Sequence, residues 1–136
     1  MARKPNIVLT EIDLERLERL IEKTSANDFP SVVGLEKELE RAKIVASAKV
    51  PKDVVTMNSS VRFCELSSNH EFTLTLVYPK DAGKDGTVSI LAPVGVALLG
   101  LKVGAEMEWP NPKGEKLKVR IEEIVFQPER AGEMHL

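Results

Sequence analysis

The chain has 136 residues, of which 43% are hydrophobic and 29% are charged, and its formal net charge at pH 7 is −2. This length supports one modest core, or a small domain with an appendage, and excludes two large domains. The nearly balanced charge excludes a general nucleic-acid binder that depends on a strong basic field. The one cysteine, Cys64, excludes an internal disulfide and a cysteine-rich zinc site.

The apolar residues give no sign of a membrane segment. The longest apolar run lies around residues 90–101, where Pro93, Gly95 and Gly100 interrupt it, and it is too short to span a bilayer. The basic residues at the start of the chain lead into an amphipathic pattern, so no secretory signal is visible. Together with the lack of disulfides, these features predict a soluble, cytoplasmic protein with no membrane partner.

Two helices are predicted in the first third of the chain. Thr10, followed three residues later by Asp13, resembles a helix N-terminal cap, and apolar residues then recur at helical spacing to about Thr24. A second helix is expected to begin near Ser31, with an apolar seam formed by Val32, Leu35, Leu39, Ala42 and Ala46. Each helix has about 15 residues, so residues 1–48 predict a short antiparallel hairpin, a coiled coil roughly 22 Å long.

The tip of this hairpin contains one acidic residue, Asp28, between Asn27 and Phe29. An exposed carboxylate on a projecting loop can coordinate a divalent ion that a partner brings. Ion clamps usually draw on at least two carboxylates, so turn or helix-cap chemistry is favoured at Asp28, and no metal site or cofactor is predicted. Periodicity alone leaves open whether the hairpin packs flat against the rest of the chain or projects from it.

After a linker at residues 49–53, the apolar period changes from helical to two. Apolar and polar residues alternate around residues 61–64, 72–78 and 116–121, and a further short strand is expected at residues 106–109. This pattern predicts a second domain over residues 49–136, with about five antiparallel, half-buried strands. The fold class is therefore expected to be α+β.

One helix is expected inside this second domain, between a short strand near Val88 and Gly104. Pro93 suits the first turn of a helix because its missing N–H would be unpaired there anyway. Gly100 suits the end of the helix because glycine tolerates a left-handed backbone. The residues between them are almost all apolar, so this helix must be buried or must present an apolar surface to a partner.

The remaining histidines and the cysteine lack the spacing of a catalytic or metal site. Neither His70 nor His135 has another His or Cys at ligand or triad spacing, which favours ordinary surface histidines. Cys64 lies in an alternating strand, where a small sheet residue is expected. A reactive thiol would need a nearby cation, and Arg62 is the obvious candidate in the sequence.

A row of cations, Lys116, Lys118 and Arg120, lies along one face of a predicted strand. The solvated outer face of a sheet and contact with an acidic partner both account for such a row. The chain contains no phosphate-binding glycine motif, no zinc-protease motif and no hydrolase nucleophile motif.

Three segments resemble a known protein family: residues 51–59 (PKDVVTMNS), residues 76–80 (LVYPK) and residues 92–101 (APVGVALLGL). About residues 54–128 resemble the C-terminal domain of the bacterial Gre-type transcript-cleavage factors. Over the entire chain, the sequence is similar to the regulators of nucleoside diphosphate kinase, a group of Gre paralogues. The resemblance implies that the hairpin is followed by an FKBP-like antiparallel sheet domain with one short helix.

The resemblance also implies a partner, RNA polymerase. In Gre-type factors the C-terminal domain docks on a coiled coil at the rim of the secondary channel. The docking loop of the family usually reads Asp-Ser-Pro before the short helix. Here Leu91, Ala92 and Pro93 occupy that place, which implies docking through burial of apolar surface. Contact with DNA is then at most indirect, through the transcription complex.

Gre-type factors also carry a pair of acidic residues to the polymerase Mg²⁺ at the tip of a long hairpin. This chain has a shorter predicted hairpin and only Asp28 at its tip. The resemblance therefore implies a non-catalytic regulator, not an enzyme, that occupies the channel rim and competes with Gre-type factors. Two alternatives remain open: transcript cleavage through Asp28, and prolyl isomerase activity suggested by the FKBP-like fold alone. The second is weak because a fold does not transfer an activity, and aromatic residues are only 4% of the chain.

Overall fold

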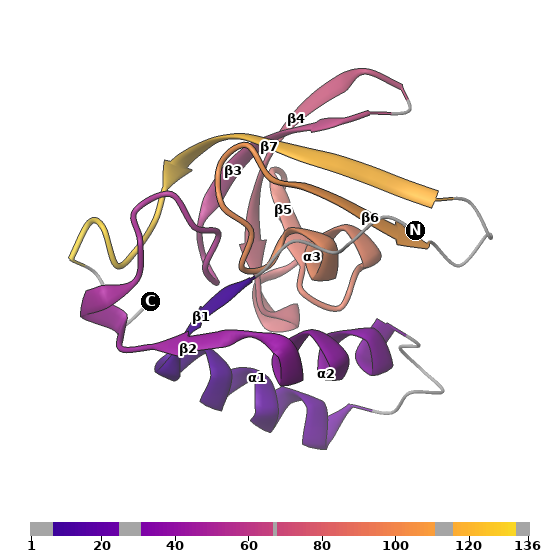
Figure 1. The fold of residues 1–136 in the computed structure, drawn as a ribbon. Helices are drawn as coiled ribbons and strands as arrows, with labels where there is room; N and C mark the ends of the chain where they lie inside the picture. Colours follow the sequence, from indigo (N-terminus) through magenta and orange to yellow (C-terminus); the bar gives the residue numbers. More distant parts are fainter. Residues whose placement is uncertain (1–6, 25–30, 67, 111–115, 133–136) are drawn as a thin grey trace.

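A computed structural model describes residues 7–24, 31–66, 68–110 and 116–132 (Figure 1). Its helices and strands are β1 (Val8–Thr10), α1 (Glu11–Lys23), α2 (Ser31–Arg41), β2 (Lys43–Val45), β3 (Ser60–Glu65), β4 (His70–Val77), β5 (Thr87–Ser89), α3 (Pro93–Leu98), β6 (Glu106–Pro110) and β7 (Lys116–Phe126), with short 3-10 turns at η1 (Ser47–Lys49) and η2 (Pro79–Asp81). Figure 1 shows α1 and α2 along one side of a curled sheet, with α3 on the side of the sheet that faces them. The α+β class is confirmed.

Helix α1 begins where the sequence predicts it. Thr10 has an extended backbone, and its side-chain oxygen accepts a hydrogen bond of 3.0 Å from the backbone N–H of Asp13. Acidic side chains in the first turn and Lys23 in the last turn complement the helix dipole. The helix ends at Lys23, and the hydroxyl of Thr24, the residue that caps it, donates to the carbonyl oxygen of Leu20.

The second helix ends earlier than predicted. Ala42 and Ala46 continue its helical spacing, but the helix stops at Arg41, and residues 43–45 form β2. Strand β2 pairs in parallel with β1, and the N–H of Lys43 also donates to the carbonyl oxygen of Ile7 at 2.9 Å. This pairing satisfies backbone groups of both strands, which a longer helix would leave unpaired. With 13 and 11 residues, α1 and α2 are about 20 Å and 16 Å long, shorter than expected.

The sheet of the C-terminal part has five strands in the order β5-β4-β3-β7-β6. Most neighbours are antiparallel, as predicted, but β5 pairs in parallel with β4, so the sheet is mixed. The parallel pairing is possible because the chain leaves β4 through η2 and returns to the sheet edge before β5 begins. Strand β5 is followed, after a short turn, by α3.

The helical hairpin and the sheet share one hydrophobic core. Leu17 of α1 and Val32 and Leu35 of α2 are fully or almost fully buried in the same cluster as Phe63 and Ile121 of the sheet. Of the two placements that the sequence left open, the structure shows the hairpin packed against the rest of the chain. The division of the chain into two domains, residues 1–48 and 49–136, stays a prediction from the sequence.

Candidate functional site

The short helix α3 and the turn before it form a corner that follows β5 in the chain, the α3 corner. Strand β5 ends in a turn in which the N–H of Leu91 donates to the side-chain oxygen of Ser89, and the N–H of Ala92 donates to the Ser89 carbonyl, both at 3.0 Å. Gly95 is required here, because a Cβ atom at that position would overlap the carbonyl oxygen of Ser89. The turn and helix are therefore held close to β5.

The far end of α3 contacts the N-terminal strand. Gly100 has a φ of 78°, the left-handed conformation that the sequence predicts for the end of this helix. Its carbonyl oxygen accepts a hydrogen bond of 3.1 Å from the N–H of Val8, and its own N–H donates to the carbonyl oxygen of Val55 at 2.8 Å. The α3 corner therefore connects β1 of the N-terminal part to the segment that precedes β3.

The residues predicted to dock on a partner differ in their exposure. Leu91 is 6% exposed and belongs to the shared core, whereas Ala92 is half-buried. Pro93 is the first residue of α3, as predicted. The Leu91 side chain is covered and anchors the turn, whereas Ala92 retains accessible surface.

The predicted hairpin tip, Asn27, Asp28 and Phe29, lies outside the described residues. Within the described ranges, no group of three or more His, Cys, Asp or Glu side chains is placed to hold a metal ion. The described helices also include none with the length and apolar character needed to cross a bilayer.

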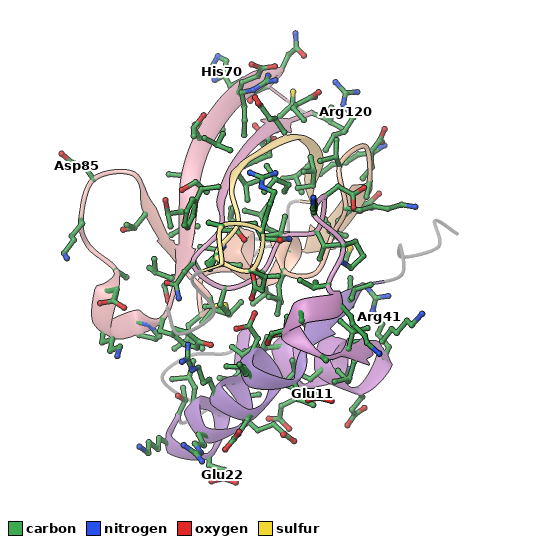
Figure 2. The ribbon with its side chains drawn as sticks, turned by 90° about the vertical axis from the view of Figure 1, so that its left-hand side faces the viewer. Glu11, Glu22, Arg41, His70, Asp85 and Arg120 are labelled. Atoms are coloured by element: carbon green, nitrogen blue, oxygen red, sulfur yellow. The ribbon has the colours of Figure 1, made fainter. Side chains whose placement is uncertain are left out.

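The other candidate residues lie on the sheet, away from α1 and α2. Figure 2 shows His70 and Arg120 at the end of the sheet opposite the helices. His70 is exposed beside Phe72, and Cys64 is buried and free. Arg120 pairs with Glu122 at 2.8 Å, and Lys118 approaches Glu106 at 3.9 Å. Half-exposed pairs of this kind fit the solvated face of a sheet.

A buried carboxylate, which the sequence pattern did not reveal, lies where α1 meets the sheet domain. Asp13 is 3% exposed, and its Oδ2 accepts a hydrogen bond of 3.0 Å from the backbone N–H of Met57. Burial raises the pKa of Asp13 to about 7, and the charge of Glu129 adds to this rise, while the Met57 N–H and Arg16 oppose it. Asp13 therefore ties α1 to a segment 44 residues further along the chain.

A second polar contact lies beside it and involves the segment after β7. The hydroxyl of Thr56 donates to Glu129 Oε1 at 2.7 Å and shares a hydrogen bond of 2.8 Å with the Ser59 hydroxyl. Gln127 Nε2 donates to the carbonyl oxygens of Pro51 and Val54 at 2.9 and 2.7 Å. These bonds hold the segment between η1 and β3 against the segment after β7, next to Asp13.

The signal that could have identified Asp13 was its position. It lies four residues before Leu17, on the apolar seam of α1, so its carboxylate faces the core. Its partner is a backbone N–H on a distant segment, which no local motif encodes.

Comparison with known proteins gives consistent family assignments for both parts of the chain. Residues 50–126 match the C-terminal domain of the transcription elongation factors GreA/GreB, and residues 5–45 match the N-terminus of Rnk. The chain is 40% identical over 131 residues to the regulator of nucleoside diphosphate kinase of Escherichia coli strain K12, a match that covers 96% of each chain. It is 34% identical over 84 residues to the transcription elongation factor GreA of Syntrophomonas wolfei, covering 61% of this chain and 53% of that protein.

A solved structure is similar as well. The prokaryotic transcription elongation factor GreA/GreB from Nitrosomonas europaea is 53% identical, with a TM-score of 0.72, over 90% of this chain and 100% of that one. The predicted family resemblance is thus confirmed in sequence and in fold. The chain belongs to the GreA/GreB transcription elongation factor family, in the group formed with the regulators of nucleoside diphosphate kinase.

Proposed function

We propose that this protein binds RNA polymerase at the rim of the secondary channel, as a non-catalytic regulator that competes with Gre-type elongation factors. The observation that carries the proposal is the pairing of a GreA/GreB-type C-terminal domain with a different N-terminal part. The C-terminal domain supplies the docking module of the family. The N-terminal helices, at about 20 Å and 16 Å, are short and share the core of the sheet domain.

The packing of the hairpin supports the absence of catalysis. The apolar seams of α1 and α2 are buried against the sheet domain through Leu17, Val32 and Leu35. Releasing the hairpin to project from that domain would expose these side chains, and each buried leucine or valine contributes about 1.5–3 kcal/mol. The hairpin therefore stays close to the sheet domain, and we infer that a protein docked at the rim does not deliver a carboxylate to the active-site metal.

The α3 corner is the proposed docking surface, and Ala92 offers the means to test it. We expect the A92R variant to weaken binding to core RNA polymerase by about tenfold or more, because a bulky charge at the turn disrupts an apolar contact. Ala92 is only half-buried and precedes the first helical residue, so the arginine can extend into solvent and the fold should be preserved.

Direct titration of labelled protein against core polymerase measures this effect. The matched control is A131R, which introduces the same charge at an exposed alanine in the turn after β7 and should bind as the unchanged protein does. Equal affinities for A92R, A131R and the unchanged protein would show that the α3 corner is not part of the interface. Failure of the unchanged protein to bind core polymerase at micromolar concentration would refute the proposed function itself.

A further inference from the structure

A cavity that the proposed function does not use lies between α1 and the segment after β4. Its volume is ≈ 480 Å³, within the usual range for small-ligand sites. One wall is α1, and the other is formed by Tyr78 and η2 together with Asn58, a turn residue with a φ of 66°. The cavity is on the outside of the shared core and opens to solvent.

Four cationic side chains line this cavity: Arg16, Arg19 and Lys23 from α1, and Lys80 from η2. The three α1 residues are spaced by three and four positions, so they share one face of the helix, where like charges repel each other. Asp81 is the one carboxylate in the lining. Because the whole chain has a net charge of −2, this cluster is a local feature and not part of a general basic excess.

In the part of the chain that the structure describes, ion pairs leave the charge of the two lysines uncompensated. Among the described residues, neither Lys23 nor Lys80 forms an ion pair, and both side chains are exposed. Arg19 pairs with Glu15, one turn earlier on α1, but both side chains are largely exposed, so the pair contributes little. An anion in the cavity would therefore meet cations from two sides.

The cavity also has an apolar wall. Leu20, Tyr78 and Pro79 line it between the cations. The Tyr78 hydroxyl is buried next to Arg16, and burial raises its pKa, so it remains a neutral hydrogen-bonding group at physiological pH. A ligand that fills this space therefore binds more tightly if it has a flat apolar part as well as negative charge.

The opposite side of α1 is electrostatically different. A groove of ≈ 380 Å³ between α1 and α2 is lined by the four carboxylates of Glu18, Glu22, Glu36 and Glu40. An anionic ligand is repelled from that groove and attracted to the cavity, so α1 separates two surfaces of opposite sign.

From this geometry we propose that the cavity binds a nucleotide that carries two or more phosphates. The phosphates meet Arg16, Arg19, Lys23 and Lys80, and the base or ribose packs on the wall that Tyr78 and Pro79 form. None of the residues that line the cavity belongs to the α3 corner, so nucleotide binding and polymerase binding can be tested with separate variants.

Calorimetric titration of the full chain with ATP, ADP, adenosine and inorganic pyrophosphate tests this proposal. We expect ATP and ADP to bind more tightly than either adenosine or pyrophosphate, and their affinity to fall as salt is raised. The double variant K23A/K80A should bind ATP about tenfold more weakly or worse, because two charge-assisted contacts are lost.

The matched control is K37A/K102A, which removes two lysines that are also exposed but do not line the cavity. It has the same net charge as K23A/K80A and should bind ATP as the unchanged protein does. The proposal is overturned if both double variants lose affinity equally, if pyrophosphate binds as tightly as ATP, or if no nucleotide binds below about 1 mM. None of these results bears on polymerase binding, which the A92R comparison tests separately.

Discussion

The D13N variant is expected to unfold with a much weaker pH dependence than the unchanged protein. The carboxyl of Asp13 has a pKa of about 7 in the folded protein against an ordinary value of 3.8, because it is buried at the junction of α1 and the sheet domain. Between these two pH values the unfolded chain loses the proton while the folded protein keeps it. The free energy of unfolding therefore falls as pH rises from about 4 to 7 and levels off above that.

The size of this effect follows from the pKa difference. The interval between 3.8 and about 7 corresponds to about 4 kcal/mol at most in the free energy of unfolding. Asparagine keeps an oxygen that can accept the hydrogen bond from the Met57 N–H but carries no charge to desolvate. We expect D13N to be more stable than the unchanged protein above pH 7 and to lose this advantage below pH 4.

Urea unfolding across this pH range measures the difference between the two proteins. The control is D85N, because Asp85 is exposed in the loop before β5, far from the helices in Figure 2. D85N should follow the unchanged protein at every pH. If D13N shows the same slope as the unchanged protein between pH 4 and 7, Asp13 is not a buried carboxyl that is protonated on folding.

The G100A variant is expected to be strongly destabilised, by about 3 kcal/mol. Gly100 combines a left-handed backbone, which costs alanine about 1–2 kcal/mol, with close contact to the N-terminal segment. A Cβ atom there would lie 2.7 Å from the Cβ atom of Ile7 and 3.1 Å from the carbonyl oxygen of Val8. Overpacking of this kind adds about 1–3 kcal/mol.

The G104A variant separates these two costs. Gly104 also has a left-handed backbone, with a φ of 88°, but an added Cβ atom would have nothing within 4 Å. Urea unfolding at one pH should show G104A losing only the conformational cost, and G100A losing about 2 kcal/mol more. Equal losses for the two variants would mean that β1 does not pack against the α3 corner as the structure describes.

Local signals account for the parts of the fold that sequence reasoning predicted well. The cap formed by Thr10 and the Asp13 N–H begins α1, and Pro93 and Gly100 mark the two ends of the α3 segment. Each of these signals lies within a few residues of the helix end that it predicts. The alternating patterns of β3 and β7 likewise follow from one buried face of a sheet.

The features that sequence reasoning missed depend on contacts between distant segments. Strand β2 forms because β1 lies beside it in space. The sequence instead predicted a longer α2, because Ala42 and Ala46 continue its helical spacing by chance. The side chain of Asp13 contacts Met57, although a cap motif predicts only a local role for it. The burial of Leu91 likewise depends on how the turn before α3 packs, and its role in docking stays a prediction.

The most direct test of the proposed function is RNA cleavage by GreA in stalled elongation complexes, titrated with this protein in the presence of Mg²⁺. We expect the protein alone to leave the RNA length unchanged and to suppress GreA-dependent cleavage as its concentration rises, with A131R acting equally well and A92R poorly. Shortening of the RNA by this protein alone would contradict its assignment as a non-catalytic regulator. Undiminished GreA activity, at protein concentrations that saturate the polymerase, would contradict competition at the channel rim.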